Sequence, residues 1–277
     1  MNLKKIMAIA VSVMLSVGAL AGCSSTPAGD SSTSGTESAG DTKTIASAAD
    51  LQGARVGVQE GTTGDIYVSE EIEGVEVSRF KRALDAVMDL QNGRLDAVVI
   101  DDLVAENLIA SNEGLKILPE ELTKEEYAIA VNKGNTELQS QINEALQTME
   151  ADGTIETIYN AFVQEDEAAL QELQAKPEPS GDSTLTMATN AEFPPFEYKD
   201  DAGNITGYDI EVAKEIARQL NMSLAIEDMA FDSLIVALTS GKADMVIAGM
   251  TVTEERQQNV DFSDNYYEAT QVIIVNE

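Results

Sequence analysis

The sequence predicts an α/β protein with two lobes of similar architecture, each built on a largely parallel sheet. Short apolar runs typical of strands recur along the chain, and stretches of helical periodicity separate them. Strands that alternate with helices favour parallel sheets. The strand-like runs are Arg55–Val58, Ala97–Ile100, Tyr127–Val131, Leu185–Thr189, Met245–Ala248 and Gln271–Val275.

Three apolar stripes with a spacing of three or four residues predict amphipathic helices. We expect Asp209 to cap the third helix, because an acidic residue just before a periodic segment is a common helix start. The stripes are formed by Leu138, Ile142, Ala145, Leu146 and Met149, by Ile155, Ile158, Tyr159 and Phe162, and by Ala213, Ile216, Ala217 and Leu220.

One internal repeat indicates the two lobes. The segment 90–100 (LQNGRLDAVVI) resembles 238–247 (LTSGKADMVI), with Leu, Gly, a basic residue and Asp in register. Each copy has the pattern of a helix end, a glycine after the helix, and then a buried strand. The alternative is a chance match within ordinary α/β sequence patterns.

Composition excludes several classes of function. The 277 residues carry a formal net charge of −32, which argues against nucleic acid and against a polybasic membrane surface. Histidine is absent and Cys23 is the single cysteine. A Cys/His zinc site, an internal disulfide and a hydrolase with a histidine base are therefore excluded, and we expect neither a metal nor a cofactor.

The N-terminus has the features of a secretion signal. A short basic region with Lys4 and Lys5 precedes an apolar stretch, and Leu20-Ala21-Gly22-Cys23 resembles a lipobox. We predict a signal peptide over 1–22 and lipidation of Cys23; the alternative is an ordinary signal peptide with an incidental cysteine. Residues 23–43 are rich in Ser, Thr and Gly, which is typical of a flexible tether.

Polar residues follow four of the predicted strands, where open α/β sheets bind their ligands. Two of these clusters lie in each predicted lobe, so a cleft between the lobes would collect them. The clusters are Gln59–Thr63, Asp101, Asn190–Phe196 and Gly249–Arg256.

These side chains suit a zwitterion. Arg256 offers two parallel donors to a carboxylate, with Thr63 and Thr251 beside it, and Asp101 offers a partner for an ammonium group. Phe193 and Phe231 are suited to flank an aliphatic chain. The alternatives are structural: a surface ion pair for Arg256, a helix cap for Asp101, turn positions for the threonines and core positions for the aromatic rings.

At these motifs the sequence closely resembles the extracellular solute-binding protein family 3, the amino-acid receptors of bacterial ABC importers. The matching stretches are Leu51–Asp65, Ala151–Phe162, Ala188–Tyr198, Gly207–Ala217, Phe231–Leu238, Gly241–Asp264 and Tyr266–Val275. The resemblance implies a periplasmic-binding-protein-like fold of type II, with two α/β lobes around a ligand cleft.

The resemblance also implies roles for matching positions. Arg256, Thr251 and Thr63 would hold the ligand carboxylate with help from Thr62, and the backbone of Gly249 and Gly61 would assist. Asp101 would hold the ammonium group, and Phe193 and Phe231 would be the flanking aromatic residues. Asn190 stands where many members have Asp, which leaves a cationic ligand side chain less certain; Glu192 lies nearby.

The order of the sections departs from the family, because the last two sections come first. We predict a circular permutation with an acidic linker over 164–184; the alternative is a misassembled or truncated gene. One lobe would be 44–122, and the other would combine 123–163 with 185–277. With the chain ending at Glu277, we expect only one covalent crossing between the lobes, near Thr123–Ala128.

The predicted function is capture of a free polar amino acid outside the cell and its delivery to an ABC permease. The protein would be a monomer anchored to the extracytoplasmic face of the cell membrane through Cys23. One alternative is a sensory binding module without transport. Another, less favoured, is an enzyme on this fold, such as a dehydratase that uses Asp101 and Glu192 as acid and base.

Overall fold

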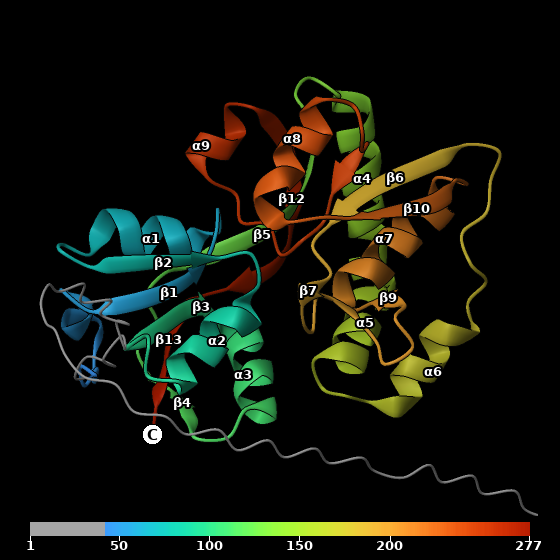
Figure 1. The fold of residues 1–277 in the computed structure, drawn as a ribbon. Coiled ribbons are helices and arrows are strands. Elements are labelled where there is room, and N and C mark those ends of the chain that lie inside the picture. Colours follow the sequence, from blue (N-terminus) through green and yellow to red (C-terminus); the bar gives the residue numbers. More distant parts are fainter. Residues whose placement is uncertain (1–41) are drawn as a thin grey trace, which may run out of the picture. The chain divides into compact units, whose positions relative to one another are not determined.

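The computed structural model describes residues 42–277, which fold around two five-stranded sheets (Figure 1). The predicted signal peptide, Cys23 and nearly all of the predicted tether lie outside the described residues. Within 42–277 no helix is long and apolar enough to cross a membrane.

The first sheet has the strand order β2-β1-β3-β13-β4. Its strands are β1 (Arg55–Gln59), β2 (Glu76–Phe80), β3 (Ala97–Asp101), β4 (Leu115–Ile117) and β13 (Gln271–Asn276). The helical segments of this lobe are η1 (Ala48–Leu51), α1 (Thr63–Glu71), α2 (Ala83–Gln91) and α3 (Asp102–Ser111).

The second sheet has the order β10-β6-β11-β5-β12. Its strands are β5 (Glu125–Asn132), β6 (Thr184–Thr189), β10 (Ser223–Asp228), β11 (Met245–Val246) and β12 (Val260–Ala269). A small antiparallel sheet contains β7 (Glu192–Phe193), β8 (Glu197–Lys199) and β9 (Ile205–Thr206). The helices here are α4 (Thr136–Asp152), α5 (Thr154–Phe162), α6 (Glu167–Ala175), α7 (Tyr208–Gln219), η2 (Phe231–Ser233), α8 (Leu234–Thr239) and α9 (Glu254–Gln257).

The sheets are mixed, whereas the sequence predicted largely parallel ones. In each sheet three neighbouring strands are parallel, and two further strands pair antiparallel beside them. The parallel strands explain the pattern that was read from the sequence: all five residues of β3 are buried, as expected for a strand covered on both faces.

The two copies of the repeat occupy equivalent places. Each runs from a helix through a glycine with positive φ into the third strand of its sheet. The side chain of Asp96 accepts a hydrogen bond from the backbone N–H of Arg55 at 2.9 Å, and that of Asp244 accepts one from Thr186 at 2.8 Å. Each Asp therefore connects the start of its strand to the neighbouring parallel strand. The prediction of two lobes with similar architecture is confirmed at this repeat.

Within residues 42–277 the chain crosses between the two sheets twice, and both crossings are covalent. One runs through residues 118–124, from β4 to β5, and the other is Thr270, between β12 and β13. The expectation of a single crossing was wrong, because Gln271–Asn276 pairs with β3 and β4 and therefore belongs to the 44–122 lobe. The apolar run of β13 is buried in that sheet rather than at the boundary.

The predicted linker contains an ordered helix. Asp166 caps α6 by accepting hydrogen bonds from the N–H groups of Ala168 and Ala169, and α6 lies beside α5 (Figure 1). Leu173 is 3% exposed and anchors this short helix in the core.

The start of α7 differs from the prediction, because Gly207 rather than Asp209 is the N-cap residue. Gly207 has φ of 131°, and a Cβ there would lie 2.2 Å from the carbonyl oxygen of Phe196. Only glycine fits so close to another backbone segment in this conformation. Asp209 lies inside the first turn with its carboxylate fully buried.

Candidate functional site

Residues from both sheets converge at the carboxyl ends of the parallel strands. Arg256 of α9 donates to the carbonyl oxygen of Gly61, which follows β1, at 3.0 Å. The Gln59 amide donates to the side-chain oxygen of Asn190, which follows β6, at 2.8 Å. The structure therefore brings the clusters after β1, β6 and β11 together. Asp101 ends β3, close enough for its charge to act on Arg256.

Arg256 is a buried guanidinium whose hydrogen-bond acceptors within residues 42–277 are carbonyl oxygens. It is 6% exposed, donates to the Thr251 carbonyl at 2.7 Å, and lies 5.4 Å from the centroid of the Phe231 ring. Among the described residues no carboxylate forms an ion pair with it. Burial lowers the pKa of Arg256, and the nearby carboxylates of Glu125 and Asp101 partly oppose that shift. A buried charge of this kind favours an anionic partner.

Glu125 was missed by the sequence analysis, and its carboxylate joins the two predicted threonines. One oxygen accepts the hydroxyls of Thr63 at 2.7 Å and Thr251 at 2.5 Å; the other accepts Thr123 at 2.9 Å. Glu125 is 5% exposed and begins β5, directly after the first crossing. The two hydroxyls predicted for a ligand carboxylate therefore hold a carboxylate of the chain itself.

Asp101 stands at the N-cap position of α3, yet its side chain makes no capping bond. It accepts instead from the hydroxyl of Tyr127 on β5 at 2.5 Å. Burial, and then the negative charge of Glu125, raise the pKa of Asp101 to about 7. The side chain is therefore directed toward the other site residues, as a ligand role requires, and not toward the helix.

The backbone groups of Gly61 and Gly249 differ from their predicted use. The Gly61 N–H donates to Asp65 at 3.1 Å, and the Gly249 N–H donates to Asp209 at 2.8 Å. Neither is free for a ligand carboxylate. Thr62 is also used internally, because its hydroxyl donates to the Gln59 carbonyl at 2.8 Å while Thr62 serves as the N-cap of α1.

Asn190 and the two aromatic rings are fixed to different degrees. The amide of Asn190 is occupied on both sides, by Gln59 and by the Met229 carbonyl at 3.0 Å. Phe193 is 6% exposed and packs in the core, 6.2 Å from the ring of Phe196. Phe231 is only partly buried, so it is the ring with surface left for a ligand.

Two further buried polar groups lie behind the site. Both carboxyl oxygens of Glu197 are buried without a hydrogen-bond partner among the described residues, and burial beside Asp209 raises its pKa well above the usual range. The pKa of Asp209 is raised by burial to about 6, and its carboxylate accepts from the Tyr266 hydroxyl at 2.9 Å. Asp209 thereby fixes the loop that carries Gly249 and Thr251.

Local sequence signals pointed weakly to the missed residues. Gln271 is a fully buried polar residue at the start of an apolar strand, and its amide contacts the Thr63 hydroxyl at 3.3 Å. Gln59 is the last residue of β1 and begins the polar cluster at which ligand contacts were expected. Glu125 carried no such signal, because Glu126 beside it is exposed and the pair reads as an ordinary acidic stretch.

Glu192 does not join Asp101. Its carboxylate lies 3.8 Å from Arg82 and has an exposed fraction of 35%, whereas Asp101 is buried against Tyr127. Burial raises the pKa of Glu192, partly opposed by Arg82. The acid and base required by the dehydratase alternative therefore have different partners in the structure.

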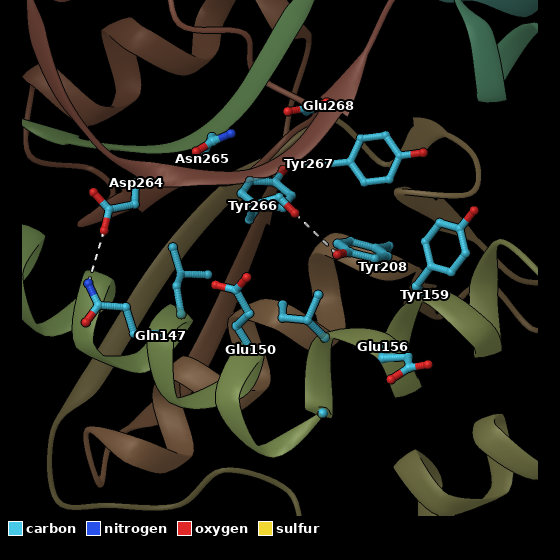
Figure 2. A pocket seen from close by; sticks show the side chains of 13 residues that line it. Gln147, Glu150, Glu156, Tyr159, Tyr208, Asp264, Asn265, Tyr266, Tyr267 and Glu268 are labelled. Carbon is cyan, nitrogen blue, oxygen red and sulfur yellow. Dashed lines mark hydrogen bonds between the residues drawn. The ribbon is translucent and has the colours of Figure 1, made fainter.

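Two cavities lie near or beside this region. One of about 550 Å³ is lined by residues that include Lys124, Glu125, Thr251 and Thr270. A larger one of about 780 Å³ lies between α4, α5, α7 and β12, where Figure 2 shows Tyr159, Tyr208, Tyr266 and Tyr267 around it. None of the predicted site residues lines the larger cavity.

The sequence of this chain is similar to those of known amino-acid-binding proteins. The chain is similar to the arginine-binding extracellular protein ArtP of Bacillus subtilis (strain 168), with 47% identity over 34% of this chain and 37% of that protein. It is also similar to the putative ABC transporter arginine-binding protein 2 of Escherichia coli (strain K12), with 38% identity over 41% of this chain and 49% of that protein. The chain thus spans less than half the length of these curated relatives.

A solved structure, the arginine-bound form of truncated ArgBP from T. maritima, is 52% identical over 31% of this chain and 40% of that one, with a TM-score of 0.30. The family comparison covers far more of the chain. Residues 41–165 and 185–277 match the bacterial extracellular solute-binding proteins, family 3. The chain therefore belongs to the family 3 bacterial extracellular solute-binding proteins.

Proposed function

We propose that this protein binds a free polar amino acid outside the cell and delivers it to an ABC permease. The observation that carries the proposal is the buried guanidinium of Arg256, which has no carboxylate partner among the described residues and lies near two threonine hydroxyls. A ligand carboxylate would neutralise it. Asp101 is the group suited to the ligand ammonium, since the two α-groups of an amino acid need opposite charges on the protein.

Relatives support an amino acid of this kind. The similar proteins named above are arginine-binding, and another relative, from Escherichia coli (strain K12), binds cystine. Asp101 and Glu125 make the surroundings of Arg256 acidic, which favours a ligand with a cationic or polar side chain. No residue of the site favours the sensory or the enzymatic alternative over binding.

We further propose that the family's sections stand in circularly permuted order. The family match is interrupted between residues 165 and 185, the segment that contains α6. Thr42 lies within van der Waals contact distance of the position that a Cβ on Gly93 would occupy, and Asn276 donates to the Leu90 carbonyl at 2.9 Å. Both chain segments thus lie at the C-terminal end of α2, where a short connection would join them.

The first prediction tests the ligand. In a thermal-shift screen of the twenty amino acids, a hit at 100 times its dissociation constant should stabilise the protein by about 2.7 kcal/mol. Arg256→Ala should then weaken binding by about 3–5 kcal/mol, because the ligand carboxylate would be buried unpaired. Calorimetry measures this loss. Arg94→Ala, which removes a side chain 68% exposed, is the control; an equal effect of both variants would remove Arg256 from the site.

The second prediction concerns pH. With a pKa of about 7 in the free protein, Asp101 is largely protonated at acidic pH, whereas the ligand ammonium needs the carboxylate. Affinity should therefore rise with pH and level off above 7, by up to about tenfold per unit below it. Asp101→Asn should flatten this profile and weaken binding at pH 8. A wild-type affinity that is constant from pH 5.5 to 8 would contradict the role of Asp101.

The third prediction concerns the permutation. A rebuilt chain that joins Glu277 to Ile45 and opens within 164–184 keeps both crossings between the sheets. It should fold, with ligand affinity in the same order of magnitude as the original chain. Opening the joined chain inside β5 instead should prevent folding, because that strand is buried. If both rebuilt chains fail to fold by circular dichroism and thermal melting, the proposed order of sections is wrong.

The fourth prediction concerns the anchor, since we propose lipidation at Cys23. Cys23→Ser should move the protein from the membrane fraction to the soluble fraction after cell fractionation. Ligand affinity should stay the same, because the predicted tether separates Cys23 from the folded residues. A variant that remains in the membrane fraction would remove the lipid anchor from the proposal.

A further inference from the structure

Glu125 occupies the place that the proposed function assigns to a ligand carboxylate. Three hydroxyls hold it: Thr63 from the first lobe, Thr251 from the second, and Thr123 from the crossing between them. Those distances, 2.5 to 2.9 Å, are typical of charge-assisted hydrogen bonds to a carboxylate. Such a set of donors from both lobes is what a bound carboxylate would need.

Arg256 is the one charged member of this group that Glu125 does not satisfy. Glu125 is the strongest charge that raises the pKa of Arg256, yet no ion pair joins the two side chains. The guanidinium instead donates to the carbonyl oxygens of Thr251 and Gly61. Glu125 therefore occupies the hydroxyls of Thr63 and Thr251, whereas the Arg256 guanidinium is bound by neutral carbonyl oxygens.

We propose that Glu125 is a resident substitute for the ligand carboxylate: it binds Thr63 and Thr251 in the free protein and leaves them when the ligand enters. This inference rests on the proposed function. A ligand carboxylate would take the two hydroxyls and also reach Arg256, which Glu125 does not pair with. Only ligands that bring their own carboxylate would then open the pocket, so Glu125 would select for that group.

The structure offers a place for the displaced side chain. The cavity of about 550 Å³ is lined by Glu125 itself and by Lys124. Four other carboxylates line it too, from Asp102, Glu121, Glu126 and Glu268. In this cavity the displaced carboxylate would lie near Lys124 and solvent, but it would lose its hydrogen bonds to the threonine hydroxyls. Leaving the threonines thus has a cost, which the ligand must overcome.

That cost predicts an effect on affinity. If the pocket is free of Glu125 in about one molecule in ten, the apparent affinity is about tenfold weaker than the intrinsic one. Glu125→Gln removes the charge and should bind L-arginine about tenfold more tightly than the wild type. Glu172→Gln, which neutralises an exposed carboxylate on α6 outside this cavity, should leave the affinity unchanged. Calorimetry measures both.

A second measurement does not depend on any amino acid. Glu125→Ala empties the hydroxyl pocket, so sodium acetate should raise the melting temperature of this variant more than sodium chloride at equal ionic strength. The wild type should respond to acetate less than this variant does, because acetate must first displace Glu125. Glu172→Ala, outside the cavity, should behave like the wild type.

The outcomes separate the two proposals. Equal or weaker L-arginine binding by Glu125→Gln would mean that Glu125 stabilises the crossing or binds the ligand. That result would overturn the proposal that Glu125 stands in for the ligand carboxylate. An acetate response that is the same in the wild type and in Glu125→Ala would do so as well. If none of the twenty amino acids binds the wild type, the proposed function fails, and the acetate measurement alone still decides the role of Glu125.

Discussion

The charge of Arg256, which forms no ion pair with a carboxylate in the described part of the chain, is the constraint around which the rest of the site is arranged. A guanidinium that is 6% exposed loses most of its hydration, and that loss must be offset by acceptors fixed in place. Here they are the carbonyl oxygens of Thr251 and Gly61, one from each lobe. The side chain therefore links the two lobes through these carbonyl oxygens.

The architecture delivers these partners through the loops after its strands and through its crossings. The loop after β1 and the loop after β11 meet at Arg256, while β5 brings in Glu125 and Tyr127. Tyr127 contacts Asp101 from β3, and Glu125 contacts Thr63 and Thr251. The crossing strand is thus part of the candidate site as well as a connection between lobes.

Much of the fold was predictable because buried strands and helix stripes leave periodic patterns in the sequence. The six predicted apolar runs correspond to the strands β1, β3, β5, β6, β11 and β13. Asp101, Thr251 and Arg256 lie at or after the carboxyl ends of strands, where the sequence predicted ligand contacts. Hydrogen-bond use was not predictable in the same way. The N–H groups of Gly61 and Gly249 are taken by Asp65 and Asp209, and no local pattern marks such distant or loop-internal partners.

The strand β13 was predicted correctly from its apolar run, but the number of crossings between the lobes was not. Its apolar run was recognised, but its partners depend on where the chain goes after Thr270. Because Gln271 pairs with Asp101 in the first sheet, the chain has already crossed before it reaches its last residues. The order of the sections can then change without cutting a crossing, since the ends of the described chain lie within one lobe. The proposed permutation therefore leaves the two connections between the sheets, residues 118–124 and Thr270, intact.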